Sequence, residues 1–214
     1  MNEPHLIYFA DPMCSWCYGF SPVITEIRRQ FGRALPIQLV MGGLRPGTDT
    51  PMEEAARETL KGHWGHVHEA TGLPFDGRVL DRPGFCYDSD PGARAVVRVR
   101  RDDPELALSF LTRLQSAFYA ENLDITDLDV LADLGAEAGF ERDAFREDLD
   151  SPSLKNETWR DYGTSQRAGV TGFPTLVAGP DGQGAYGVVT RGFQPGDQIL
   201  AILNHWMDLP QVQA

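Results

Sequence analysis

The sequence predicts an α/β fold in which the sheet-forming segments lie at both ends of the chain. Short apolar and aromatic runs at 5–10 and 36–41 are typical of buried strands. Two further short apolar segments, 175–178 and 186–190, lie near the other end and are separated by a turn signal. Between them, helix-start signals follow one another closely. We therefore expect a sheet built from both ends of the chain, with a helical block inserted at 48–168.

The first strand is followed by a helix that returns the chain to the second strand. From Cys14 to about Phe31 the apolar residues recur at helical spacing, namely Phe20, Val23, Ile24 and Ile27. Pro22 lies inside this stretch and is expected to kink the helix. The second strand ends at Gly42-Gly43. This order, strand–helix–strand, is how an α/β layer begins.

Cap-then-proline signals divide the middle of the chain into helices. Thr50 to Glu53 combines an N-cap, a first-turn proline and a capping-box glutamate. Three further pairs repeat the signal, Asp90-Pro91, Asp103-Pro104 and Ser151-Pro152, and Thr126 or Asp127 is expected to cap another helix. The predicted helices cover 51–70, 91–101, 104–121, 127–139, 142–149 and 152–168.

Pro195 opens a last helix, whose apolar face contains Ile199, Leu200, Ile202 and Leu203. We expect a discontinuous domain made of 1–47 and 169–214, with 48–168 as a helical insertion domain. No repeat or flexible linker interrupts this order.

Composition and charge narrow the classes of function. The chain has 214 residues, of which 42% are hydrophobic, and a formal net charge of −12. An acidic surface repels nucleic acid and anionic membranes, so neither is expected as a partner. No apolar run approaches the ~20 residues that span a bilayer, and the first residues do not resemble a signal peptide. We expect a cytoplasmic protein.

The pair in Cys14-Ser15-Trp16-Cys17 is the strongest chemical signal. Its position between a strand and a helix places both cysteines on one helix face, with α-carbons ~5–5.5 Å apart, within reach of a disulfide. Cys14 lies at the helix N-terminus, where free amides favour an anion and lower a thiol pKa. Cys14 is therefore the predicted nucleophile, and Cys17 the resolving thiol.

The residues near the pair in sequence provide no positive charge that would stabilise a thiolate. No Lys, Arg or His lies between His5 and Arg28. Asp11 would oppose a thiolate, and it is either a proton acceptor for Cys17 or a turn residue before Pro12. Trp16 could offer an apolar surface to a substrate.

Other readings of the cysteines and histidines are weaker. A zinc site usually needs four ligands, and the one remaining cysteine is Cys86. Cys86 is expected to be buried and inert, although a second redox thiol is the alternative. His63, His66 and His68 are expected to line a cleft or face solvent rather than bind a metal. No metal site is therefore predicted.

Three motifs, in this order, carry a resemblance to a known family. They are Asp11-Pro12-Met13-Cys14-Ser15-Trp16-Cys17-Tyr18-Gly19, then Gly42-Gly43-Leu44-Arg45-Pro46, then Gly169-Val170-Thr171-Gly172-Phe173-Pro174-Thr175. With them the sequence resembles the DsbA-like branch of the thioredoxin superfamily, and more closely its cytosolic, FrnE-like members. The resemblance covers nearly the whole chain.

The resemblance implies a thioredoxin fold with a large all-helical insertion, and a thiol–disulfide oxidoreductase. It implies that Pro174 is a cis-proline facing the cysteines and helping to keep metals away from them. Phe173 would then present backbone groups to an extended substrate. No bound cofactor is expected beyond a redox-active disulfide, with glutathione as a candidate co-substrate. The expected partners are protein or small-molecule disulfides and thiols, and the chain would be a monomer or homodimer.

Two other functions share this fold. Kappa-class glutathione transferases and 2-hydroxychromene-2-carboxylate isomerases usually carry serine at the position of Cys14 and lack the second cysteine, so the intact pair favours redox chemistry. A non-catalytic peptide-binding or chaperone-like module is the third hypothesis. Oxidase, reductase and isomerase all remain open, because ~30 mV in reduction potential shifts the equilibrium tenfold.

Overall fold

Both ends of the chain contribute to one mixed sheet. A computed structural model describes residues 3–208. The strands are β1 (His5–Ala10), β2 (Ile37–Met41), β3 (Thr175–Gly179) and β4 (Gly187–Arg191), in the order β2-β1-β3-β4. β2 is parallel to β1, whereas β3 is antiparallel to both β1 and β4. The N-terminal strand therefore pairs with strands from both ends of the chain.

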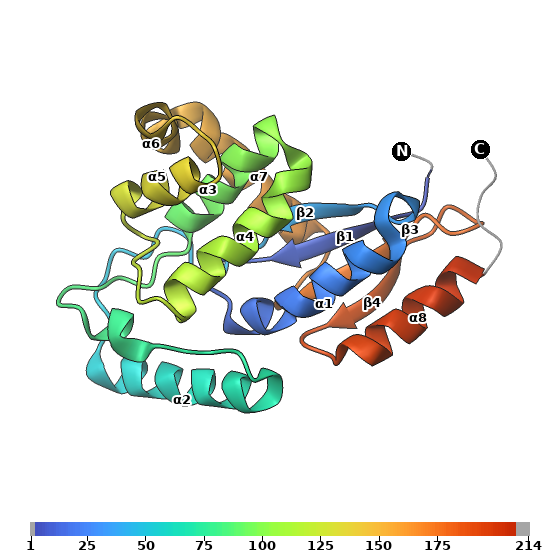
Figure 1. The fold of residues 1–214 in the computed structure, drawn as a ribbon, viewed down its shortest axis with the longest axis horizontal. Helices are drawn as coiled ribbons and strands as arrows, with labels where there is room; N and C mark the ends of the chain where they lie inside the picture. The colour runs from blue at the N-terminus through green and yellow to red at the C-terminus, as the bar shows by residue number, and fades with distance from the viewer. Residues whose placement is uncertain (1–2, 209–214) are drawn as a thin grey trace.

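Helices surround the sheet and extend beyond one end of it. Their bounds are α1 (Ser15–Phe31), α2 (Glu54–Thr71), α3 (Asp90–Asp102), α4 (Pro104–Tyr119), α5 (Leu128–Glu137), α6 (Arg142–Asp150), α7 (Pro152–Arg167) and α8 (Gly196–Asp208), with short 3₁₀ turns η1 (Gly32–Ala34) and η2 (Gly77–Asp81). Helices α1 and α8 contact each other, and α7 contacts β2 (Figure 1). Helix α2 lies apart from the other inserted helices in this view. No helix among residues 3–208 is long and apolar enough to cross a membrane.

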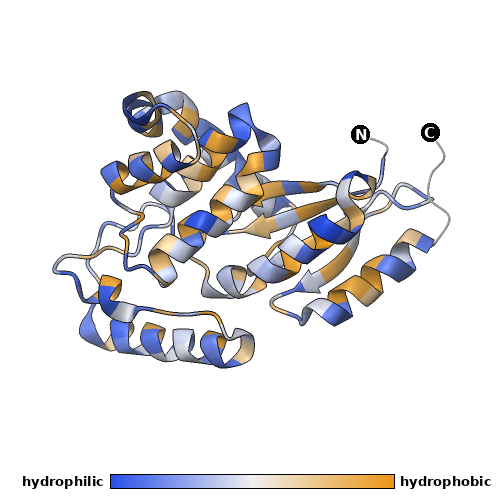
Figure 2. Ribbon diagram, viewed as in Figure 1, coloured by the Kyte–Doolittle hydropathy of each residue, from blue (hydrophilic) through white to orange (hydrophobic). Residues whose placement is uncertain are grey.

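The core forms where the strands meet the helices. Four of the six residues of β1 are buried apolar residues, because β1 has a paired strand on each side (Figure 2). One hydrophobic cluster joins Leu6 and Leu176 of the sheet to Val96 and Leu114 of the inserted helices. The helical block is thus packed against the sheet through a shared core.

Helix α1 runs uninterrupted through Pro22, where the sequence predicts a kink. Proline lacks the N–H that would bond to the carbonyl four residues earlier, which belongs to Tyr18. The Ser21 hydroxyl donates to that carbonyl at 2.8 Å instead. A side chain therefore satisfies the backbone acceptor that Pro22 leaves free.

The predicted caps are partly confirmed. The side chains of Asp103, Asp127 and Ser151 accept bonds from the amides of their first turns. Helix α2, however, begins at Glu54 rather than at 51, and the amide of Met52 donates to the carbonyl of Phe85 at 3.0 Å. In the predicted helix this amide would have bonded to the Thr50 side chain as a cap, and it bonds to a distant carbonyl instead.

At the start of α3 the sequence prediction is also wrong. Asp90 is the first helical residue and Ser89 is the N-cap, with no side-chain cap bond. The Ser89 hydroxyl accepts the amide of Arg45 at 3.1 Å, and Arg45 belongs to the loop after β2. A contact between distant segments replaces the local cap.

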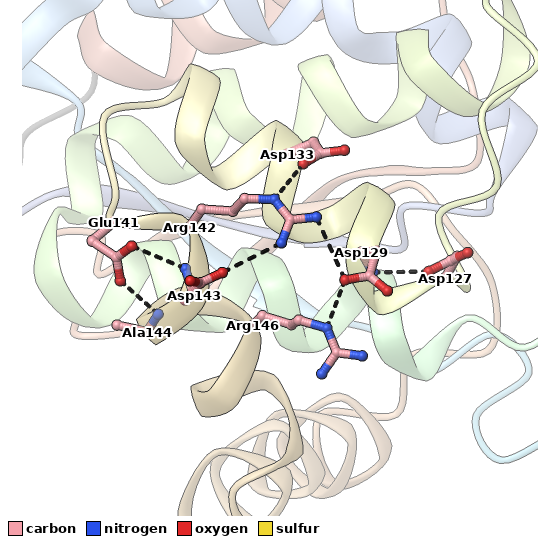
Figure 3. Close-up of polar contacts among 8 residues, drawn as sticks. All are labelled: Asp127, Asp129, Asp133, Glu141, Arg142, Asp143, Ala144 and Arg146. Atoms are coloured by element: carbon pink, nitrogen blue, oxygen red, sulfur yellow. Dashed lines mark hydrogen bonds and ion pairs between the residues drawn. The ribbon is translucent and has the colours of Figure 1, made fainter.

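An ion-pair network joins α5 to α6 (Figure 3). The guanidinium of Arg142 contacts the carboxylates of Asp129, Asp133 and Asp143, and Arg146 contacts Asp129 as well. All of these side chains are at least 40% exposed. Replacing Arg142 with alanine should therefore leave the free energy of unfolding nearly unchanged, because solvent and salt screen exposed ion pairs. Urea denaturation would measure this, and a clearly lower unfolding midpoint would contradict it.

Candidate active site

Cys14 is the N-cap of helix α1. Its backbone is extended, with φ −92° and ψ 111°, and the helix begins at the next residue. The Cys14 Sγ atom accepts a hydrogen bond from the amide of Cys17 at 3.3 Å, as polar N-cap side chains do. A thiolate at this position would be stabilised by that amide and by the positive end of the helix dipole.

Cys17 lies one turn into the helix and is fully buried. Burial raises the pKa of the Cys17 thiol well above its usual value, and the hydrogen bond and charge of Cys14 raise it further. Both cysteines are free thiols. The two sulfurs therefore lie in different environments, because Cys14 alone reaches the surface, at 6% exposure.

The segment before β3 packs against Cys14 from the other end of the chain. The peptide bond between Phe173 and Pro174 is cis, and the Cys14 thiol donates to the carbonyl of Phe173 at 3.5 Å. The pairing register explains this meeting, because Phe9 of β1 lies opposite Thr175 of β3. Since the strands are antiparallel, the residues after β1 and those before β3 share one edge of the sheet.

Two glycines after β2 make room for aromatic rings at this edge. A Cβ atom at Gly42 would lie 2.2 Å from the ring of Phe173, and one at Gly43 would lie 2.8 Å from the ring of Tyr162. Gly43 also has φ +74°, a conformation that favours glycine. In the sequence this pair marks the end of a strand and part of a motif, and nothing local indicates its contact with Phe173.

Asp11 lies buried directly behind the cysteine motif. One carboxylate oxygen accepts the amide of Met13 at 2.9 Å, and the other accepts the amide of Leu44 at 2.8 Å. Burial raises the pKa of the Asp11 carboxyl to about 6, although these amides and the Ser89 hydroxyl lower it. The bond to Met13 is the turn role, one of the two alternatives that the sequence left open. The bond to Leu44 is new, and it ties the loop after β2 to the active-site turn.

The pH dependence of stability should report on Asp11. Its folded-state pKa of about 6 exceeds the ordinary value of 3.8, so the native state binds this proton more tightly than the unfolded state does. The resulting stability is complete below pH 4 and is lost as the pH rises through 6. Relative to the Asp11→Asn variant, reduced wild type should lose about 2 kcal/mol of unfolding free energy between pH 4 and pH 7. Urea titrations at both pH values measure this, and parallel changes in the two proteins would contradict it.

Tyr87 positions the backbone next to Cys14. Its hydroxyl donates to the carbonyl of Met13 at 2.5 Å and lies 3.4 Å from the hydroxyl of Tyr119. Burial raises the pKa of Tyr87, so the phenol remains a neutral donor. Neither tyrosine was predicted as a site residue, because they lie on a loop and a helix of the insertion and no local motif marks them.

A cavity of about 610 Å³ opens above Cys14. Its wall is formed largely by α2 and the loop before it, with Trp16 and Phe173 on the side of the cysteine pair. The lining residues are Met13, Cys14, Ser15, Trp16, Leu44, Arg45, Met52, Ala55, Ala56, Thr59, Leu60, His63, Tyr87 and Phe173. Pro174 is buried and is not among them. The cavity thus brings two basic residues, Arg45 and His63, to a motif that has none in its local sequence.

The histidines of α2 and Cys86 do not form a common site. His63 meets Trp16 edge-on at 6.1 Å between ring centroids, whereas the Nδ1 atom of His68 bonds to the carbonyl of Leu73 at 2.8 Å. Within residues 3–208 no group of three or more His, Cys, Asp or Glu side chains could hold a metal ion. Cys86 is half-buried rather than buried as expected, because in the loop between η2 and α3 its two neighbours Phe85 and Tyr87 occupy the interior instead.

Solved structures with clear sequence similarity share this architecture. A candidate protein disulfide isomerase from Nitrosomonas europaea is 34% identical, with a TM-score of 0.86 over 96% of this chain and 98% of that one. The cytosolic disulfide reductase DsbM from Pseudomonas aeruginosa is 30% identical, with a TM-score of 0.76 over 94% of this chain and 98% of that one. A second structure of DsbM contains GSH.

One relative found by sequence is named as an adapter protein rather than as an oxidoreductase. The ClpXP adapter protein SpxH of Halalkalibacterium halodurans is 25% identical over 207 residues, which is 94% of this chain and 67% of that protein.

Fold and site together define a DsbA-like member of the thioredoxin superfamily, with a four-stranded sheet and a large helical insertion. The thioredoxin family model matches residues 8–199, and the chain belongs to that family. Its structural neighbours support thiol–disulfide oxidoreductases as its general class.

Proposed function

We propose that this protein is a thiol–disulfide oxidoreductase that uses Cys14 as the nucleophile and Cys17 as the resolving thiol. One observation carries the proposal: the Cys14 sulfur accepts the amide of Cys17 at a helix N-terminus, beneath an open cavity. The cavity gives a substrate access to Cys14, while Cys17 is fully buried. This asymmetry matches the two roles, since the attacking sulfur must meet the substrate and the resolving sulfur need meet only Cys14.

In the first step the Cys14 thiolate attacks one sulfur of a substrate disulfide. A mixed disulfide forms, the substrate S–S bond breaks, and one substrate thiolate leaves. The backbone at Phe173 is proposed to hold the substrate beside Cys14, with Pro174 fixing the direction of that backbone and Trp16 covering the other side.

In the second step Cys17 loses its proton and attacks the Cys14 sulfur. The second substrate thiolate leaves, and the protein dithiol becomes a disulfide while the substrate is reduced. Burial holds the proton on Cys17, so this step needs an acceptor. Asp11 is proposed for that role, because its charge acts on Cys17 and its carboxyl, with a pKa of about 6, is largely ionised at neutral pH.

Equilibration in glutathione redox buffers tests the proposal. After acid quenching and thiol trapping, mass spectrometry should show one disulfide that links Cys14 to Cys17, with Cys86 still alkylated. Its midpoint gives the reduction potential and thereby the favoured direction of exchange. If no Cys14–Cys17 disulfide formed at any buffer ratio, the proposal would fail.

The names of the relatives support two additions to this proposal, one on the co-substrate and location and one on a second candidate function. The structure of DsbM with GSH and its description as cytosolic support glutathione as a co-substrate and the cytosol as the location. The SpxH relative supports a second candidate function, in which the protein binds another protein without redox turnover. Binding that survives in a Cys14→Ser, Cys17→Ser double variant would favour that second function.

A further inference from the structure

The cavity above Cys14 differs in charge from the protein as a whole. The chain carries a formal charge of −12, yet the lining contains Arg45 and His63 and no carboxylate. The rest of the lining is mostly apolar, including Met52 and Leu60. A substrate in the cavity therefore meets a basic group next to apolar walls.

Arg45 is held in this position by the structure around it. Its backbone amide donates to the Ser89 hydroxyl at 3.1 Å, and its guanidinium carbon lies 5.5 Å from the ring centroid of Tyr87. Tyr87 in turn donates to the carbonyl of Met13, the residue before Cys14. The guanidinium is thus anchored through one aromatic ring to the backbone of the nucleophile.

In the described part of the chain, no carboxylate forms an ion pair with this guanidinium. Other arginines, such as Arg98 and Arg100, form ion pairs with aspartates at 2.5–2.6 Å. Among residues 3–208, no ion pair within 4.0 Å includes Arg45. The acidic Asp88 nearby directs one oxygen to the amides of Gly47 and Asp90.

Charged groups far from the cavity contribute little to the electrostatic potential beside Cys14. At physiological ionic strength the Debye length is about 8 Å, so acidic groups on the far surface are largely screened from the cavity. The local charge of Arg45 therefore outweighs the net charge of the chain for a group bound beside Cys14.

We propose that Arg45 is a specificity-determining residue that selects disulfides bearing a carboxylate near the reacting sulfur over neutral and cationic ones. This inference rests on the proposed exchange at Cys14. The guanidinium pairs with the substrate carboxylate while the Cys14 thiolate forms the mixed disulfide and the substrate thiolate leaves. The charge acts on substrate binding and orientation, and the electrons move between the sulfurs alone.

Three small disulfides of different charge test this selection. Single-turnover oxidation of the reduced protein is followed with dithiodipropionate, which is anionic, 2-hydroxyethyl disulfide, which is neutral, and cystamine, which is cationic. Comparing each variant with wild type on the same reagent cancels the intrinsic reactivity of that reagent. The Arg45→Gln variant should reduce the anionic-to-cationic rate ratio about fivefold, the size of one partly screened charge pair.

Two further variants sharpen the outcome. Arg33→Gln removes the same charge from the exposed turn at the opposite end of α1 and should leave the ratio unchanged. Arg45→Lys should retain part of the preference, since the charge remains. Equal ratios in wild type, R45Q and R33Q would overturn the selection by Arg45, even with rapid exchange on the neutral disulfide. Failure of wild type to react with all three reagents would instead overturn the proposed function.

Discussion

Replacing Cys14 with serine is expected to reduce disulfide exchange to the uncatalysed background. A serine hydroxyl remains protonated near neutral pH and cannot form a disulfide, so neither step of the exchange can begin. Cys17 cannot substitute for it, because Cys17 is fully buried and burial raises the pKa of its thiol well above the usual value. Reduction of 2-hydroxyethyl disulfide, followed by the release of mercaptoethanol, measures the loss.

Two companion variants separate the roles of the cysteines. Cys17→Ser should retain the first step and accumulate a mixed disulfide on Cys14, which mass spectrometry detects as an added substrate thiol. Cys86→Ser is the matched control and should exchange at the wild-type rate, because Cys86 lies in the loop between η2 and α3 and does not line the cavity. If exchange persisted in C14S and disappeared in C86S, Cys14 would not be the nucleophile.

Replacing Gly42 with alanine is expected to disturb both stability and exchange. The added Cβ atom would lie 2.2 Å from the Phe173 ring, far inside van der Waals contact, so the ring must move. Overpacking of this kind costs about 1–3 kcal/mol of unfolding free energy. Because the carbonyl of Phe173 contacts the Cys14 thiol, exchange should also slow several-fold.

The loop before β3, which carries Phe173, supplies a control for Gly42. A Cβ atom at Gly172 meets nothing within 4 Å, so Gly172→Ala should change the unfolding free energy by less than about 1 kcal/mol. A double variant, Gly42→Ala with Phe173→Ala, removes the clashing ring and should be less destabilised than the sum of the single variants. Additive losses would show that Gly42 does not act through Phe173. Urea denaturation measures wild type and all four variants, Phe173→Ala included.

Much of the fold follows from local patterns in the chain. The first strand was predicted with its observed bounds, and the helices from α3 to α7 lie within a few residues of their predicted ranges. Such predictions succeed because alternation, helical spacing and capping residues act over short distances. They failed at Met52 and at Ser89, where a backbone or side-chain group bonds to a distant segment instead.

The position of the cysteine pair was also predictable, since a helix N-terminus after a strand is a local feature. The turn role of Asp11 was likewise visible, because its bond to Met13 spans two residues. Its raised pKa was not visible, because that shift arises from burial under segments distant in sequence. For the same reason, the contact of Asp11 with Leu44 had no signal in the sequence.

Local patterns were enough to predict the order of strands and helices, the place of Cys14 at the start of a helix, and the spacing that brings Cys17 to the same face. The surroundings of the Cys14 sulfur depend on contacts that form when the whole chain folds. The antiparallel register of β1 and β3 brings Phe173 to Cys14, and packing of the insertion adds Tyr87 and the wall that faces Arg45. Helix geometry is set within a single turn of the chain. Burial, charge and substrate access depend instead on contacts between segments far apart in the sequence, so local patterns cannot reveal them.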